Sequence, residues 1–252
     1  MRAIMERLGF TTELYGKCEQ DVYHKEPVSN FEMHRALFGP NVDGRVRGYW
    51  RDVGGRLLGD GCGKRLGPED FYLYLCAHGH KHYTISGTGL RSLLDVYVYL
   101  SKVDLDMGYV AAEARKMGIA GFEEASRSLA VRLFSGRELA AADREMLGYF
   151  MSSGAYGTLG QQVQNAMAKS GGGRLRYALG RFLVPVSEGD ERYEAFAARY
   201  PLFYEHRALL PLLPIYRAAR SMKSGRFMAE ARAIRDAREP GSVLPPGRMR
   251  GA

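Results

Sequence analysis

Hydrophobic and polar residues alternate with a period of two near the start of the chain and with a helical period over most of the remainder. Phe31 and Met33 alternate with polar neighbours and predict a strand within residues 26–38, just after a turn. Asp21-Val22-Tyr23-His24-Lys25 predicts the strand before it, and we expect the two to pair as a hairpin. A further short strand is predicted at Thr11-Thr12-Glu13-Leu14.

Helical periodicity predicts a first helix over residues 1–9, ending at Gly9, and further helices along the rest of the chain. These helices cover residues 48–58, 69–82, 90–102, 109–117, 122–134, 159–169, 174–183, 191–199, 202–220 and 226–238. Ser135-Gly136-Arg137-Glu138 has the spacing of a capping box and predicts the start of another helix. The sequence therefore predicts an α+β protein that is mostly α-helical, with two or three strands near the N-terminus followed by a helical bundle.

Changes in composition divide the chain into four predicted regions. Residues 1–38 hold the strands, and residues 39–169 form a helical domain. Residues 170–239 form a basic helical C-terminal region that opens with the flexible linker Ser170-Gly171-Gly172-Gly173. Residues 240–252 carry three prolines and three glycines and are predicted to be a disordered tail.

The positive charge is concentrated at the C-terminal end. The chain of 252 residues has a net charge of +8, and residues 199–252 hold eleven Lys and Arg against four Asp and Glu. A solvated basic surface explains this bias. The alternative is a surface for phosphate, nucleic acid or another acidic partner, although no interleaved aromatic residues or known nucleic-acid motif accompany it.

Cysteine usage and hydropathy indicate the compartment. Cys18, Cys62 and Cys76 are odd in number, widely spaced and without a Cys-x-x-Cys pair, which favours reduced thiols over disulfides or a zinc site. No apolar run approaches the roughly 18 residues of a membrane helix. The N-terminus lacks the apolar core of a signal peptide. We therefore expect a cytoplasmic protein that does not enter a membrane.

Three histidines form the first candidate site, in Ala77-His78-Gly79-His80-Lys81-His82. On a helix, His78 and His82 share a face, whereas His80 points elsewhere. A zinc site would need a third ligand from another element, and the Glu of a His-Glu-x-x-His motif is absent. Two alternatives remain open: His and Lys side chains that offset the helix dipole at a C-terminus, and side chains that bind phosphate at the edge of a cleft.

The second candidate is Gly87-Thr88-Gly89 with the helix start that follows it. Its glycines would let a backbone approach phosphate at a helix N-terminus. Arg91 and Asp95 lie four residues apart, and we favour a structural salt bridge between them that also anchors the His-rich helix. A complete phosphate-binding loop of the Gly-x-x-x-x-Gly-Lys-Ser/Thr type occurs nowhere in the chain.

The third candidate is the carboxylate of Glu32, which the strand alternation places on one face with His34. A carboxylate held on a sheet beside an imidazole suits a metal-dependent transferase. The alternatives are a solvent-facing strand and an ion pair of Glu32 with Arg35 or Lys25. No Gly-x-Ser-x-Gly motif or recognisable cysteine nucleophile is present.

Three blocks, taken in order and spacing, resemble the uncharacterised nucleotidyltransferase family of bacteria. They are Phe31-Glu32-Met33-His34-Arg35-Ala36-Leu37-Phe38, then Pro68-Glu69-Asp70-Phe71-Tyr72-Leu73-Tyr74-Leu75 with Ala77-His78 and Lys81-His82, then Gly89-Leu90-Arg91-Ser92-Leu93-Leu94-Asp95. The resemblance covers roughly residues 1–165. It implies a polymerase-beta-like nucleotidyltransferase, in which a Gly-Ser turn, an Asp-x-Asp pair and a third carboxylate on a later strand hold two Mg²⁺ ions that clamp an NTP.

Glu32 is the position that best fits the third carboxylate, as a catalytic and metal-binding residue. The residues that we expect to bind substrate or phosphate are His34, His78, Lys81, His82, Arg91 and Asp95. No Gly-Ser turn followed by Asp-x-Asp occurs in a strand context, and Asp104-Leu105-Asp106 is rejected because we expect it in a loop between helices. The expectation is that residues 1–38 are a remnant of the mixed sheet and that the missing part lies upstream.

These observations support three functional hypotheses. The first is a nucleotidyltransferase-family protein that uses Mg²⁺ and an NTP, transfers a nucleotidyl group to an unknown acceptor, and is incomplete and inactive as this chain. The second is a non-catalytic helical binding module whose basic C-terminal surface takes nucleic acid or an acidic partner. The third is a metal hydrolase built on the His cluster.

Overall fold

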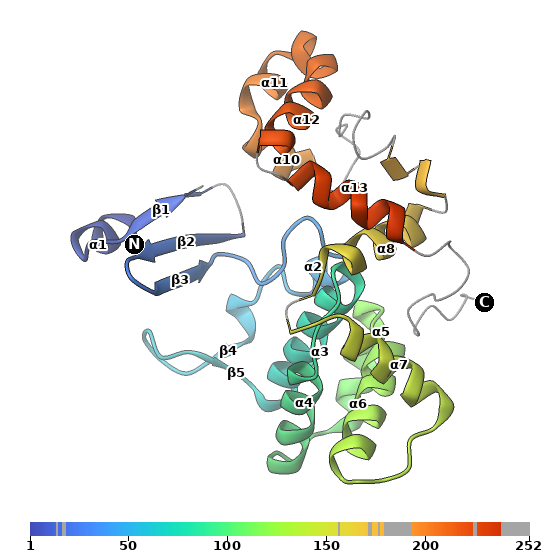
Figure 1. The fold of residues 1–252 in the computed structure, drawn as a ribbon. Helices are drawn as coiled ribbons and strands as arrows, with labels where there is room; N and C mark the ends of the chain where they lie inside the picture. Colours follow the sequence, from blue (N-terminus) through green and yellow to red (C-terminus); the bar gives the residue numbers. More distant parts are fainter. Residues whose placement is uncertain are drawn as a thin grey trace. The chain divides into compact units, whose positions relative to one another are not determined.

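The computed structural model describes residues 1–13, 15–16, 19–155, 157–170, 173–175, 177–178, 193–223 and 226–237. The chain divides into two compact units. Figure 1 labels the helices and strands of both units. The first unit comprises Met1–Arg56 with Pro185–Leu213, and the second comprises Leu57–Val184 with Pro214–Ala252. As predicted, the protein is α+β and mostly helical, with its largest sheet near the N-terminus.

The first unit begins with a short helix and a three-stranded antiparallel sheet of order β1-β2-β3. The elements are α1 (Arg2–Arg7), β1 (Thr11–Glu13), β2 (Gln20–Lys25) and β3 (Ser29–His34). Gly9 follows α1 with a φ of 82°, a left-handed conformation that glycine adopts without steric cost. The predicted hairpin is confirmed, because β2 and β3 pair from Gln20 opposite His34 to Lys25 opposite Ser29.

The two faces of this sheet differ in burial. On β2, Asp21 and Tyr23 are buried, and Tyr23 has no exposed surface. Their cross-strand partners on β3 are Met33 and Phe31. Side chains directly opposite one another share a face, so Val22 and Glu32 lie on the other side of the sheet. The period-two pattern thus puts Glu32 on the more solvated face.

A short helix, α2 (Gly44–Tyr49), follows the sheet in the first unit. The Asp43 carboxylate caps it by accepting a 2.8 Å hydrogen bond from the backbone N–H of Arg45. Val46 and Trp50 are buried, and the ring of Trp50 lies 6.4 Å from that of Phe38. A single 3₁₀ turn, η1 (Gly54–Arg56), ends this part of the unit.

The predicted helix over residues 48–58 is wrong. The helix begins earlier, where Asp43 provides a cap, and ends before Gly54 and Gly55, which are poor helix formers. Residues 57 and 58 form β4 (Leu57–Leu58), which pairs antiparallel with β5 (Arg65–Leu66). The second unit therefore opens with a small hairpin, and β4 lies where the end of that helix is predicted.

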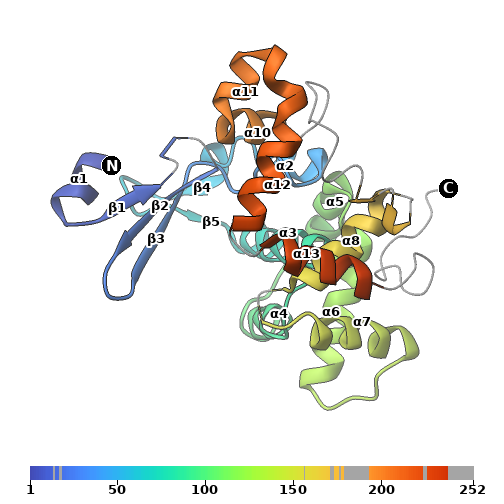
Figure 2. The same cartoon turned by 45° about the horizontal axis from the view of Figure 1, so that its top comes forward.

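The second unit is a bundle of helices around α3 (Pro68–Ile85). Pro68 starts this helix, one residue before the predicted start, and Glu69 and Asp70 in its first turn complement the helix dipole. Helix α3 packs against α4 (Arg91–Lys102), α5 (Met107–Met117), α6 (Ala120–Phe134) and α8 (Leu159–Ser170) (Figure 2). Leu73, Cys76 and Tyr83 lie in the core of this bundle.

The ends of the bundle helices follow local signals with one exception. Helix α5 ends at Met117, as predicted, and Gly118 follows it with a φ of 70°. The predicted capping box at Ser135 is wrong: Ser135 ends α6, and its hydroxyl bonds back to the carbonyl of Val131. The next helix, α7 (Ala141–Ser152), begins six residues later. There the carboxylate of Asp143 accepts a 2.9 Å hydrogen bond from the N–H of Ala140.

The C-terminal helices are shorter than predicted. The single helix predicted over residues 202–220 is wrong, and three pieces replace it: α11 (Pro201–Glu205), η2 (Arg207–Leu212) and α12 (Leu213–Lys223). The chain leaves helical geometry at His206, with φ −112° and ψ 83°. Pro211 and Pro214 then lack the backbone donors that a longer helix would need.

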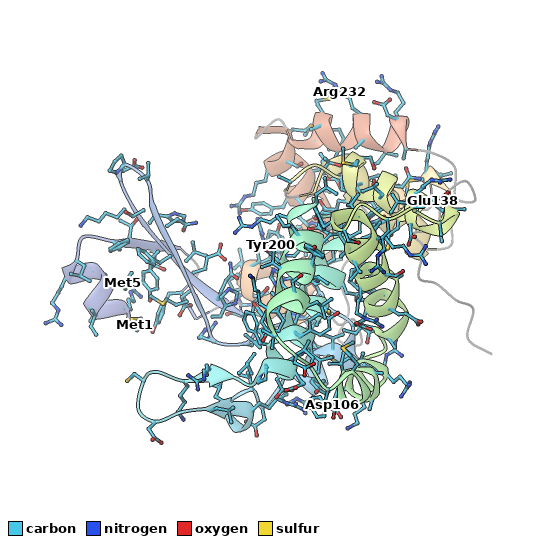
Figure 3. All side chains as sticks on the ribbon, turned by 90° about the horizontal axis from the view of Figure 1, so that it is seen from below. Met1, Met5, Asp106, Glu138, Tyr200 and Arg232 are labelled. Atoms are coloured by element: carbon cyan, nitrogen blue, oxygen red, sulfur yellow. The ribbon has the colours of Figure 1, made fainter. Side chains whose placement is uncertain are left out.

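Two further helices complete the described C-terminal part. In the first unit, α10 (Tyr193–Arg199) packs against α11, and the rings of Tyr193 and Tyr204 meet edge to face at 5.2 Å. Tyr200, labelled in Figure 3, precedes α11. In the second unit, α13 (Arg226–Asp236) lies along α8 in two views (Figure 1, Figure 2). Val163, Met167 and Ala237 form the buried centre of that contact.

Several predicted features lie outside the described residues. They are the tail over residues 240–252, most of the helix over residues 174–183, the centre of the linker over residues 170–173, and Cys18. Within the described part of the chain, no helix is long and apolar enough to cross a bilayer.

Candidate functional site

Strand β3 positions the carboxylate that the sequence singles out. Oε2 of Glu32 lies 3.8 Å from Nε2 of His34, two residues further along the same face. This distance is too long for a hydrogen bond. The side chains of Glu32 and His34 are 48% and 35% exposed. Such an exposed contact contributes little to stability, so the carboxylate is not fixed by its neighbour.

The two predicted ion-pair partners of Glu32 are engaged elsewhere. Nε of Arg35 lies 3.7 Å from Oδ1 of Asp21, on the opposite face of the sheet. Nζ of Lys25 donates a 2.8 Å hydrogen bond to the carbonyl of Leu8. The two cations predicted to pair with Glu32 therefore bind other groups. Among the described residues, neither forms an ion pair with its carboxylate.

Register adds neighbours that the sequence pattern did not single out. On β2, Gln20 is opposite His34, and His24 is opposite Asn30. The face that carries Glu32 therefore holds two imidazoles and two carboxamides as well. The strand period in the sequence indicates that His24 shares a face with Val22, two residues before it. Because Val22 pairs with Glu32, His24 is also on the face of Glu32.

Helix α3 brings two of the three candidate histidines together. Nε2 of His82 lies 3.0 Å from Nε2 of His78, and the ring centroids are 4.6 Å apart. His80 packs instead against the ring of Phe122, at 5.1 Å. The prediction that His78 and His82 share a face and His80 does not is confirmed.

The electrostatics around His82 favour its neutral form. Burial lowers the pKa of His82 below its usual value of 6.5, and the positive charge of Lys81 lowers it further. His82 lies in the last turn of α3, which ends at Ile85. The carbonyl of His82 accepts hydrogen bonds from the N–H groups of Ser86 and Gly87, so backbone donors satisfy this part of the helix end.

The glycine-rich turn after α3 approaches another loop closely. A Cβ on Gly87 would collide with the side chain of Ser153, and a Cβ on Gly89 would lie 2.9 Å from Cα of Ala155. The N–H of Thr158 donates a 2.9 Å hydrogen bond to the carbonyl of Ser86. Close packing against this second loop explains why residues 87 and 89 are glycines, without a role in binding phosphate.

The predicted salt bridge between Arg91 and Asp95 is wrong. Both side chains are exposed on α4, and no ion pair joins them in the described structure. The i, i+4 spacing permits contact, but the entropy of two long exposed side chains opposes it. Neither side chain therefore anchors the His-rich helix.

Asp104-Leu105-Asp106 lies between α4 and α5, as predicted. Asp106, labelled in Figure 3, caps α5: Oδ1 accepts hydrogen bonds from the N–H groups of Gly108 and Tyr109, at 2.8 and 3.0 Å. Its carboxylate is therefore used by the backbone, and the letters Asp-x-Asp mark a helix start.

Buried polar residues form networks that sequence patterns did not reveal. Glu123 is 3% exposed and accepts hydrogen bonds from Tyr72 and Arg127. Asn165 is 4% exposed and donates 2.7 Å to the hydroxyl of Tyr149. Both networks join helices of the bundle, and every group named is paired, which is typical of structural networks.

The basic C-terminal surface is partly neutralised within α13. Nε of Arg235 lies 2.9 Å from Oδ1 of Asp236, and the hydrogen bond and charge of Arg235 lower the pKa of that carboxyl. Arg232, labelled in Figure 3, is exposed on the same helix. Binding of nucleic acid or an acidic partner to this surface stays a prediction.

The candidate residues divide between the two units. Glu32 and His34 belong to the first unit. His78, Lys81, His82, Arg91 and Asp95 belong to the second. Across the described residues, no group of three or more His, Cys, Asp or Glu side chains is arranged to hold a metal ion.

Comparison with protein families gives one match. Residues 1–135, more than half of the chain, match the model of a family described as uncharacterised nucleotidyltransferase. The matched segment contains β3 with Glu32 and all of α3. No curated protein and no solved structure matches the chain.

Proposed function

Because the chain belongs to the uncharacterised nucleotidyltransferase family, we propose that it takes part in the transfer of a nucleotidyl group from an NTP to an acceptor, with Glu32 as a ligand of the catalytic metal ion. The observation that carries the proposal is the position of this carboxylate. It lies on a hydrogen-bonded strand, half exposed, with Arg35 and Lys25 engaged elsewhere. A strand holds a ligand more precisely than a loop does.

The chemistry of Glu32 suits Mg²⁺. This ion prefers oxygen ligands and is commonly bound through one or two carboxylates together with substrate phosphates and water. When bound, it neutralises charge on the phosphate oxygens during transfer. Glu32 therefore fits as one ligand of such a site.

The proposal includes a limit on activity. The 252 residues contain no Gly-Ser turn followed by Asp-x-Asp on a strand, and the one Asp-x-Asp among the described helices caps α5. Glu32 by itself does not hold two Mg²⁺ ions. We therefore expect these 252 residues to bind a divalent ion weakly through Glu32 and not to complete the transfer by themselves.

Two measurements on the full chain test the proposal. Mn²⁺, as a paramagnetic substitute for Mg²⁺, should broaden the NMR signals of β3, and Glu32→Ala should abolish the broadening. Glu26→Ala is the matched control, because Glu26 is an exposed carboxylate in the turn before β3. Broadening that persists in Glu32→Ala would refute the metal-ligand role.

The second measurement is a transfer assay with labelled NTPs and Mg²⁺. The expected result is no incorporation above background. Robust metal-dependent transfer that Glu32→Ala removes would overturn the limit on activity while supporting the role of Glu32.

A further inference from the structure

The two imidazoles of His78 and His82 are arranged as a chelating pair. Their Nε2 atoms are 3.0 Å apart, on successive turns of α3. Without a bound ion, one Nε2–H donates to the other Nε2, a contact that requires different tautomers for the two rings. When neither Nε2 carries a proton, the two atoms are close enough to bind the same ion.

The separation matches the requirements of a divalent transition metal. Imidazole nitrogens bind such ions at about 2.1 Å. Two nitrogens 3.0 Å apart, each at that distance from one ion, subtend an angle of about 90° at the ion. This is the angle of square-planar or octahedral coordination, and opening the pair by about 0.4 Å gives the tetrahedral angle that Zn²⁺ prefers.

The surroundings hold the pair in place. Helix α3 has 18 residues, and its side chains Leu73, Cys76 and Tyr83 are fully buried in the bundle. The ring of Tyr74 lies 5.7 Å from that of His78, one turn before it. A helix fixed in this way keeps the two ligands close to their bound separation, so little ordering entropy opposes binding.

Access from solvent also permits binding. Both rings are only half-buried, so an ion reaches them from solvent. The charge of Lys81 opposes a bound cation but favours an anion beside it.

We propose that His78 and His82 form a two-imidazole binding site for a divalent transition-metal ion such as Zn²⁺, Ni²⁺ or Cu²⁺, with water or an anion in the remaining positions. This site is separate from the proposed function, because Mg²⁺ prefers oxygen ligands and its proposed ligand Glu32 is on another element. The donors here are nitrogen atoms, which select the later first-row metals.

The test uses the full chain without a histidine tag. Calorimetric titration with ZnCl₂, NiCl₂ and CuCl₂ should show one ion per chain, with Cu²⁺ bound most tightly and MgCl₂ giving no competing heat. His78→Gln and His82→Gln should each lower the affinity at least tenfold, a loss of roughly the size that metal-site substitutions cause. His80→Gln is the matched control, because His80 is on the same helix and packs against Phe122.

A second readout does not depend on the variants folding. Electron paramagnetic resonance of the wild-type chain with one equivalent of Cu²⁺ should show coupling to two imidazole nitrogens. Circular dichroism checks that each variant keeps its helices. The proposal is overturned if Cu²⁺ shows fewer than two nitrogen ligands, or if His80→Gln lowers the affinity as much as His82→Gln.

Discussion

The hydroxyl of Tyr72 donates a 2.8 Å hydrogen bond to Oε1 of Glu123, which lies 51 residues further along the chain. Nε of Arg127 donates to the same oxygen at 2.8 Å. Tyr72 has no exposed surface and Glu123 is 3% exposed, so a buried carboxylate joins α3 to α6 with its charge paired. Burial raises the pKa of Tyr72, so the phenol keeps the proton that it donates.

Replacing Tyr72 by Phe should destabilise the bundle by about 1.5–3 kcal/mol, because a hydrogen bond to a charged group is lost while the carboxylate stays buried. Urea unfolding followed by circular dichroism measures the change. Tyr99→Phe is the matched control: its hydroxyl donates to the carbonyl of Pro68 at an exposed position, so the loss should stay below about 1 kcal/mol. Equal losses in the two variants would contradict this role of Glu123.

Tyr83 and Tyr149 allow two hydroxyl groups to be compared in nearly the same environment, since their rings lie 4.3 Å apart. The Tyr149 hydroxyl donates 2.6 Å to the carbonyl of Tyr83 and accepts from Asn165. Tyr149→Phe should therefore cost about 1–3 kcal/mol. The Tyr83 hydroxyl is buried with no hydrogen-bond partner in the described structure, so Tyr83→Phe should be neutral or stabilising. The midpoints of urea unfolding measure both changes. A larger loss of stability in Tyr83→Phe than in Tyr149→Phe would refute this assignment of the hydrogen bonds.

These buried networks could not be predicted from the sequence, whereas several local features could. The hairpin of β2 and β3, the start of α3 to within one residue and the end of α5 at Met117 were predicted, because each depends on residues within a few positions. Nothing near Glu123 in the sequence indicates that it is buried, since its partner Tyr72 is on another helix. Burial of a polar group depends on contacts across the fold, which periodicity does not report.

The candidate site residues likewise include some features that were predicted correctly from the sequence and one that was not. The shared face of Glu32 and His34, and that of His78 and His82, follow from the periods of a strand and a helix. The salt bridge of Arg91 with Asp95 was predicted from spacing alone and does not form, because both side chains remain solvated. Spacing states which side chains can meet, and the environment decides which of them do.

Gly87 should tolerate no side chain. Its φ is 85°, and a Cβ would meet the buried side chain of Ser153. We expect Gly87→Ala to lose about 2–4 kcal/mol from backbone strain and overpacking together. Gly148, inside α7 with open space where a Cβ would lie, is the control: Gly148→Ala should gain up to about 1 kcal/mol. Thermal melting temperatures should move in opposite directions, and a Gly87→Ala protein as stable as wild type would refute the close approach.

Protonation of His82 should weaken the fold in mild acid. Its pKa is lowered below 6.5 in the folded state, by burial and then by Lys81, so the unfolded chain takes up the proton first as the pH falls. The free energy of unfolding contributed by this group is complete above pH 6.5 and declines below it, through the folded-state pKa. Urea midpoints at about pH 7.5 and pH 5.5 should differ less in His82→Gln than in wild type. An unchanged difference would show that other groups cause the acid sensitivity.

The pairing of β2 with β3 makes the length of their connection critical. Glu32 is opposite Val22, and Phe31 is opposite the fully buried Tyr23. Removing a single residue between Lys25 and Ser29 would slide one strand past the other by one position and exchange the two faces. Glu32 would then lie on the face that holds the buried Tyr23, and Phe31 would move to the more solvated face. Natural insertions and deletions in this connection are therefore expected in pairs, because only an even change returns the acid to the solvent side.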